Sequence, residues 1–174
     1  MKKTPALLAA AALTAPVALS AQTIDLPQRK AGLWEITMSF EKPKAMPPFT
    51  AQACLDAATD KEMMEYGLKM AGCKQMNVKR EGKTIVVEAN CTIAGIATKS
   101  KTVITGDFQS SYTVRSEGTA AMEGAKGQEM LTTQTATWKS ADCPGMKPGD
   151  MTMFGGVKVN IKQIKALSGT IGKF

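Results

Sequence analysis

The chain has 174 residues and a formal net charge of +7, and it contains no histidine. This length suits one domain with a modest core. The lack of histidine excludes catalytic sites that pair a Ser or Cys nucleophile with a His base. The sequence also has no P-loop and no dinucleotide-binding glycine fingerprint. We therefore expect a protein that is not an enzyme and that needs no cofactor.

The first 21 residues have the pattern of a secretory signal peptide. Two lysines precede an apolar run, Ala6–Leu19, which ends in the small residues Ser20 and Ala21. The run is too short to anchor the chain in a membrane, and no later segment resembles a membrane span. We expect cleavage after Ala21, with cleavage after Ser20 as the alternative. The sequence therefore predicts a periplasmic or secreted protein in which residues 22–174 form a single β-rich domain.

Removing the two lysines of the signal peptide leaves 20 basic and 15 acidic residues, a net charge of +5. The basic residues are scattered, and few aromatic side chains are present to stack on bases, so we expect no nucleic-acid partner. We interpret the charge as favouring solubility. Binding to an anionic component of the cell envelope is the alternative.

The segment Cys73–Cys91 is predicted to form a β-hairpin with a cysteine at each end. A three-residue loop, Glu81–Lys83, has a central glycine that can adopt the positive φ of a short hairpin loop. Counting outward from this loop, Arg80 would face Thr84 and the two cysteines would face each other. Directly opposed residues are close enough for a disulfide.

An even number of cysteines in an exported domain indicates disulfides. The hairpin selects the pair Cys73–Cys91, which leaves Cys54 to pair with Cys143. In the chain-entropy model, a loop of about 90 residues closed by the second bond gives roughly 4–5 kcal/mol of stability. Zinc binding is the competing interpretation. It would require four isolated thiolates, since the chain has neither a Cys-x-x-Cys pair nor a histidine.

Alternating apolar and polar residues predict a strand over Gly32–Phe40, with Trp34 on the apolar face. We interpret Trp34 as a core residue. A proline-rich loop over Lys42–Phe49 follows, and Thr50–Leu55 is predicted to be a short strand.

One helix is predicted with a clear start and end. Thr59–Glu62 matches a capping box in which Thr59 caps the helix and Glu62 reaches back to it. The helix would run to about Ala71 and end at Gly72. Near the C-terminus, Val157–Leu167 is compatible with either a strand or a short helix.

Three further strands are predicted at Ile93–Thr105, Phe108–Glu117 and Gln128–Lys139, with a turn-rich segment after them. Strands at this short spacing favour antiparallel pairing over parallel βαβ units. We therefore predict a mainly β (α+β) fold. It consists of one antiparallel β-meander, as a half-open barrel or a cupped sheet, with one capped helix and two disulfides.

Several features are shared with a known family: the sequence KAGLWE at Lys30–Glu35, the spaced cysteines, Trp138 ahead of Cys143, and Pro144–Asp150. On these features the chain resembles the small exported bacterial proteins of the domain of unknown function 3617 family. The resemblance implies export and a β-rich domain with structural cysteines. It implies no activity.

Four carboxylates lie on or near the predicted meander: Asp107, Glu117, Glu123 and Glu129. A pair of carboxylates can cleave a glycosidic bond. Because nothing in the spacing of these residues singles out a pair, we interpret each one as a solvated charge.

Three methionines, Met146, Met151 and Met153, are close together in the sequence, and thioether sulfurs favour Cu(I). The chain offers no histidine to complete such a site. We therefore prefer the interpretation that methionines fill irregular gaps in the core and that the protein binds no metal.

Two classes of function remain. In the first, which we prefer, the sheet binds a small apolar ligand or lipid fragment in a cavity lined by Trp34, Met38 and Trp138. In the second, the domain is an interaction module, like exported inhibitor domains, that binds a protein or an anionic envelope polymer through its outer face. The two classes differ in whether side chains fill the space at Trp34.

Overall fold

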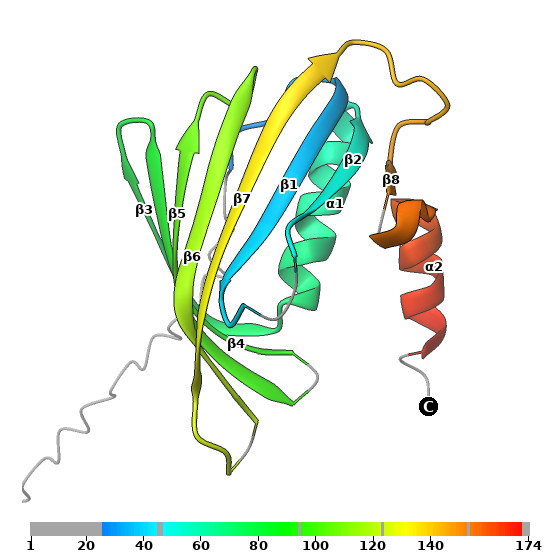
Figure 1. The fold of residues 1–174 in the computed structure, drawn as a ribbon. Coiled ribbons are helices and arrows are strands. Elements are labelled where there is room, and N and C mark those ends of the chain that lie inside the picture. The colour runs from blue at the N-terminus through cyan, green and yellow to red at the C-terminus, as the bar shows by residue number, and fades with distance from the viewer. Residues whose placement is uncertain (1–25, 45–46, 94, 123, 153, 172–174) are drawn as a thin grey trace, which may run out of the picture.

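The structure is a computed structural model, and it describes residues 26–44, 47–93, 95–122, 124–152 and 154–171. The predicted signal peptide lies outside these ranges. Nine antiparallel strands form one open sheet in the order β3-β4-β5-β6-β7-β1-β2-β8-β9 (Figure 1). The strands are β1 (Gly32–Lys42), β2 (Phe49–Leu55), β3 (Cys73–Glu81), β4 (Thr84–Ile93), β5 (Ile96–Gly106), β6 (Ser111–Met122), β7 (Gln128–Ser140), β8 (Asp150–Thr152) and β9 (Lys158–Asn160).

Two α-helices accompany the sheet, α1 (Ala57–Met70) and α2 (Ile161–Ile171), together with a short 3-10 turn, η1 (Phe154–Gly156). Helix α1 lies against the curved sheet, whereas α2 lies beside β8 (Figure 1). Within the described ranges, neither helix has the length and apolar character needed to span a bilayer.

The predicted mainly β, antiparallel fold is confirmed, and the strand order adds one feature to it. Strands β3 to β7 form a meander in sequence order. The N-terminal hairpin β1–β2 is not continuous with this meander in the chain, but β1 pairs with β7 and β2 pairs with β8. The hairpin therefore joins the meander to the short C-terminal strands.

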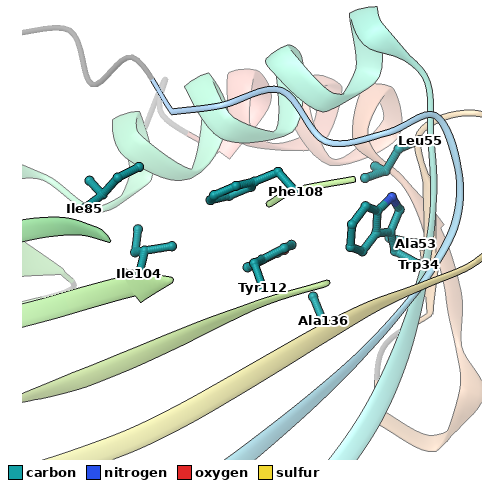
Figure 2. Close-up of a cluster of buried hydrophobic side chains, with 8 residues drawn as sticks. All are labelled: Trp34, Ala53, Leu55, Ile85, Ile104, Phe108, Tyr112 and Ala136. Atoms are coloured by element: carbon teal, nitrogen blue, oxygen red, sulfur yellow. The ribbon is translucent and has the colours of Figure 1, made fainter. Parts of the chain in front are cut away.

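The core lies between α1 and one face of the sheet, which we call the inner face (Figure 2). Trp34 is fully buried there, which confirms its interpretation as a core residue. Its ring lies 5.6 Å from that of Tyr112, which in turn stacks on Phe108 at 4.9 Å. The buried cluster comprises Trp34, Ala53, Leu55, Ile85, Ile104, Phe108, Tyr112 and Ala136.

The predicted helix is present, but its N-terminal cap was assigned to the wrong residue. Asp56 is the N-cap: its carboxylate accepts a hydrogen bond from the backbone N–H of Thr59 (2.7 Å), and the Thr59 hydroxyl accepts one from the N–H of Asp56 (3.0 Å). Thr59 thus takes the role expected of Glu62, whose carboxylate instead pairs with Lys165 of α2. At the other end, Gly72 has the expected positive φ of 57°.

The predicted hairpin is formed by β3 and β4, and the cysteines at its ends face each other. The predicted register inside it was wrong, because Arg80 faces Ile85 rather than Thr84 and the loop has two residues rather than three. A bulge directly after Cys73 shifts the register by one residue. The shorter loop and the bulge shift the register by one residue in opposite directions. Cys73 and Cys91 therefore face each other as predicted, although the register between them and the loop differs.

Both predicted disulfides, Cys73–Cys91 and Cys54–Cys143, are formed, and no cysteine is free. The zinc interpretation is therefore wrong. Several strand boundaries also differ from the prediction. Phe108, which was predicted to begin a strand, lies in the loop before β6 with a positive φ of 58°. Strand β6 extends through Gly118 to Met122, and the ambiguous segment Val157–Leu167 contains both a strand, β9, and the start of α2.

Candidate functional site

The KAGLWE segment forms a structural junction at one end of the sheet. Gly32 has a φ of +124°, and a Cβ at this position would collide with the carbonyl oxygen of Ser140. The indole N–H of Trp138 donates to the carbonyl of Ala31 at 2.9 Å. These contacts join the start of β1 to the end of β7 and explain why a glycine stands at this position.

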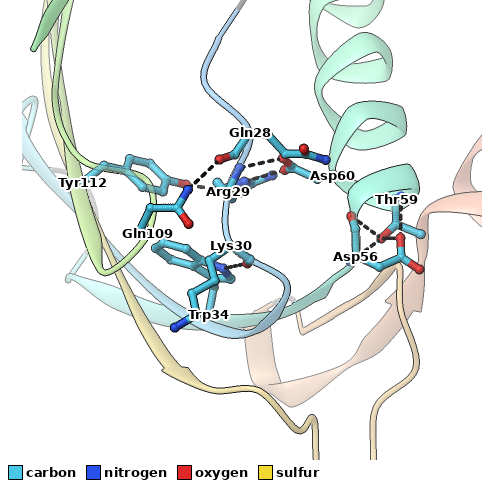
Figure 3. A network of polar contacts seen from close by, with 9 residues as sticks. All are labelled: Gln28, Arg29, Lys30, Trp34, Asp56, Thr59, Asp60, Gln109 and Tyr112. Carbon is cyan, nitrogen blue, oxygen red and sulfur yellow. Dashed lines mark hydrogen bonds and ion pairs between the residues drawn. The ribbon is translucent and has the colours of Figure 1, made fainter.

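The two tryptophans that we predicted as ligand contacts both hold this junction. The indole N–H of Trp34 donates to the carbonyl of Lys30 at 2.8 Å (Figure 3). The Lys30 ammonium group lies 3.7 Å from the centre of the Trp138 ring. Met38, the third candidate, is half-buried on β1. Rings and aliphatic side chains fill the space around Trp34, so its ring has no surface left for a ligand.

A buried ion pair connects the segment before β1 to α1. The guanidinium of Arg29 donates to the carboxylate of Asp60 at 2.6 Å, and the backbone N–H of Arg29 donates to the same carboxylate at 3.0 Å (Figure 3). Arg29 also donates to the hydroxyl of Tyr112 at 3.1 Å. Asp60 is 1% exposed. These groups satisfy one another, so we assign them a role in stability.

The four candidate carboxylates do not come together. Asp107 accepts hydrogen bonds from the backbone N–H groups of Ser110, Gln109 and Ser111, which hold the pKa of its carboxyl far below the usual value. Glu129 pairs with Lys42 at 2.8 Å.

Of the remaining two carboxylates, Glu117 lies on β6, and Glu123 lies outside the described residues.

The methionine candidates also have different surroundings. Met151 packs against the core, Met146 is half-buried in a turn, and Met153 is outside the described residues. Among the residues that the structure describes, no three His, Cys, Asp or Glu side chains form a group that could hold a metal ion.

A polar groove crosses strands β3 to β6 and is the candidate site. It consists of two adjoining hollows of about 680 and 510 Å³. They share four polar residues, Gln75, Asn90, Lys99 and Thr119. The first hollow is further lined by Met76, Asn77, Glu88, Ala89, Ser100, Lys101, Glu117 and Gly118, and the second by Lys74, Cys91, Thr92, Ala97, Thr98 and Ala121.

The charged side chains of the groove point away from the core. Successive side chains of a strand alternate between its two faces, and the buried residues Ile85, Ile104 and Tyr112 define the inner face on β4, β5 and β6. Residues an odd number of positions away, such as Lys101, lie on the opposite face. We call this the outer face, and it is the face that α1 does not cover.

Strand pairing arranges the outer-face residues of the groove in two rows. In the first row, Lys101 of β5 is directly opposite Glu88 of β4 on one side and Glu117 of β6 on the other. In the second row, the pairing runs from Gln75 through Asn90 and Lys99 to Thr119. We call these the charged row (Glu88, Lys101, Glu117) and the carboxamide row (Gln75, Asn90, Lys99, Thr119).

The charged side chains of the groove have no partner among the residues that the structure describes. Glu88, Lys99, Lys101 and Glu117 form no side-chain hydrogen bond or ion pair with another described residue.

Elsewhere on the outer face, three pairs of opposite charges are in contact: Lys42–Glu129, Arg115–Glu41 and Lys139–Glu35. The charged row differs from these three pairs, because its members are cross-strand neighbours yet form no ion pair with one another.

Gly118 lies at the centre of the groove. A Cβ at this position would collide with the carbonyl oxygen of Lys99 and would approach the Cα of Ser100 to 2.8 Å. The missing side chain thus lets β5 and β6 approach more closely than another residue would permit. The groove has no signal in the sequence, because its rows depend on the register of four strands.

A search of protein-family models matches residues 29–143 to the family described as Protein of unknown function (DUF3617). The chain belongs to this family. The match includes the KAGLWE segment and all four cysteines, and it ends before the segment Pro144–Asp150 that we had also compared. Neither the curated proteins nor the solved structures include a match to the chain.

Proposed function

We propose that this DUF3617 protein is an exported, non-catalytic interaction module that binds a protein partner through the groove on its outer face. The observation that carries the proposal is the set of unpaired charges in the charged row. Charged side chains that make no internal contact remain available for complementary charges on a partner. The flanking carboxamide and hydroxyl groups add hydrogen-bonding capacity of the kind found in polar interfaces.

The packing of the inner face favours this function over the binding of an apolar ligand. The rings of Trp34 and Tyr112 and their aliphatic neighbours fill the space that such a ligand would need around Trp34. Apolar ligands bind in concave sites lined mainly by hydrophobic side chains, whereas nine of the twelve residues that line the first hollow are polar.

Export is supported by the two disulfides, because disulfides persist mainly in oxidising compartments. We infer a periplasmic or secreted location after cleavage of residues 1–21. Intact-mass measurement of the protein from the exported fraction tests this inference. The expected mass is that of a chain beginning at Gln22 with both disulfides formed. A full-length, reduced mass would contradict it.

Affinity capture from envelope extracts tests the proposed function. The bait proteins are the wild type, a groove variant with Lys99→Glu and Lys101→Glu, and a control variant with Lys139→Glu. Lys139 lies on the same face outside the groove. The expected result is a partner protein that is retained by the wild type and the control and lost from the groove variant. Equal capture by all three baits would exclude the groove as the binding site.

A further inference from the structure

We propose that the groove recognises a peptide segment in which basic and acidic side chains alternate. This inference rests on the proposed function and adds the chemistry of the partner. It is based on the order of charges in the charged row, on the free hydrogen-bonding groups of the carboxamide row, and on the length of the groove.

The charged row presents negative, positive and negative side chains in succession. Neighbouring strands are about 4.8 Å apart, so the backbones at Glu88 and Glu117 are roughly 10 Å apart, with Lys101 between them. This spacing is about one Debye length at physiological ionic strength, so the charges are not fully screened from one another. A polyanion would meet two carboxylates, and a polycation would meet the lysines. A segment of alternating charge can place an opposite charge against each member of the row.

The carboxamide row offers the complement of a peptide group. The side-chain amide of Asn90 donates to the side-chain oxygen of Gln75 at 2.9 Å. This bond leaves the amide N–H groups of Gln75 as donors and the side-chain oxygen of Asn90 as an acceptor. A backbone C=O and N–H of a bound segment could satisfy both groups. The row therefore favours a peptide over a ligand that carries only charges.

The length of the groove limits the segment to a few residues. Four adjacent strands span three inter-strand spacings, or about 14 Å. An extended chain advances about 3.3 Å per residue, so the groove would hold four or five residues of a strand-like segment. Alternate side chains of such a segment point in the same direction and are about 6.6 Å apart, against about 4.8 Å between members of the charged row. The long side chains of Lys and Glu can span this difference, so the sequence basic-x-acidic-x-basic fits the row.

Capped pentapeptides provide the test: Lys-Thr-Glu-Thr-Lys as the probe, with Glu-Thr-Glu-Thr-Glu and Lys-Thr-Lys-Thr-Lys as matched controls. Binding is followed by NMR titration of the isotope-labelled, oxidised mature protein at low salt. The probe should shift amide resonances in residues 75–77, 88–90, 99–101 and 117–119, and it should bind more tightly than either control. Exposed ion pairs contribute little to affinity, so we expect roughly a 1.4- to fivefold advantage for each matched charge.

A charge-reversal variant adds a test in which the affinity for one peptide should increase. An unfolded variant would not give this result. Lys101→Glu makes the charged row entirely acidic, so this variant should bind Lys-Thr-Lys-Thr-Lys more tightly than the wild type does and Lys-Thr-Glu-Thr-Lys more weakly. An unchanged order of affinities in Lys101→Glu would overturn the inference. A control peptide that binds the wild type as tightly as the probe does would also overturn it.

The remaining outcomes separate this inference from the proposed function. If no peptide binds but capture of a protein partner still depends on Lys99 and Lys101, only the alternating-charge inference fails. If the probe binds but shifts resonances outside strands β3 to β6, the alternating-charge inference fails. If, in addition, the three baits capture the partner equally, the groove is not the binding site and both proposals fail.

Discussion

Gly32 and Ser140 meet so closely that no side chain fits between them. A Cβ on Gly32 would collide with the Ser140 carbonyl oxygen and would lie 2.9 Å from the indole nitrogen of Trp138. The φ of +124° at Gly32 also lies in a region that other residues rarely adopt. The glycine of the KAGLWE segment is therefore required by the joining of β1 to β7.

Gly32→Ala should destabilise the fold, because the new methyl group would separate β1 from β7 and would strain the backbone. We expect a loss of more than about 2 kcal/mol in the free energy of unfolding, as is typical of overpacking combined with backbone strain. Gly67→Ala in α1 is the matched control. Its Cβ would meet no atom within 4 Å, and the change should stabilise the helix by up to about 1 kcal/mol. Urea unfolding measures both effects, and a Gly32→Ala variant as stable as the wild type would contradict the account.

Removal of Arg29 should be costly, because it leaves the carboxylate of Asp60 buried without its partner. Breaking one side of a buried ion pair typically costs about 3–5 kcal/mol. The control is Lys42→Ala, which breaks an exposed pair with Glu129 and should cost much less, because solvent screens exposed ion pairs. Thermal and urea unfolding at neutral pH distinguish the two changes. Similar losses for Arg29→Ala and Lys42→Ala would show that the Arg29 pair is not a major contributor to stability.

Sequence patterns predicted the elements that are determined by residues close together in the chain. The alternation around Trp34 was sufficient for β1, and the two prolines before Phe49 marked the end of a loop. The cap of α1 was misplaced by one turn because Asp56 and Thr59 are both good N-cap residues, and the capping box that Asp56 forms with Thr59 was overlooked. The hairpin register was misassigned because the loop has two residues rather than three, and the bulge after Cys73 masked this error by keeping the two cysteines opposed.

The candidate site could not be predicted for a different reason. Glu88, Lys101 and Glu117 are far apart in the chain, and each one alone resembles a solvated surface charge. They become a row only through two strand registers, and the absence of ion pairs among them is a property of side-chain geometry. Conversely, Trp138 attracted attention as a ligand contact although its N–H and ring are both engaged in the junction with Lys30 and Ala31.

The two disulfides should contribute unequally to stability. Cys73 and Cys91 are 18 residues apart, whereas Cys54 and Cys143 are 89 residues apart. In the chain-entropy model, these separations correspond to about 3 and about 4–5 kcal/mol. The double variant Cys54→Ser with Cys143→Ser should therefore be less stable than Cys73→Ser with Cys91→Ser. Unfolding of both variants, with the reduced wild type as reference, measures the difference. The opposite order would mean that strain or residual structure outweighs loop entropy.

The cap of α1 should make part of the stability depend on pH. The backbone N–H and the hydroxyl of Thr59 lower the pKa of Asp56 in the folded protein. A carboxyl whose pKa is lowered by folding contributes stability above its unfolded pKa, about 3.9, and this contribution is lost as the pH falls through the folded value. Asp56→Ala should therefore cost about 0.5–2 kcal/mol at pH 7, and the difference from the wild type should shrink as the pH falls below about 4.

Asp56→Asn is the control for this prediction, because it keeps a capping oxygen but removes the titrating charge. Its smaller loss should stay nearly constant above about pH 5, where Asp56 of the wild type is ionised in both the folded and the unfolded state. Urea unfolding of the three proteins between pH 3 and pH 7 measures the free energies of unfolding. A cost of Asp56→Ala that is the same at both ends of this range would show that the charge of Asp56 does not contribute, and that its capping oxygen alone stabilises α1.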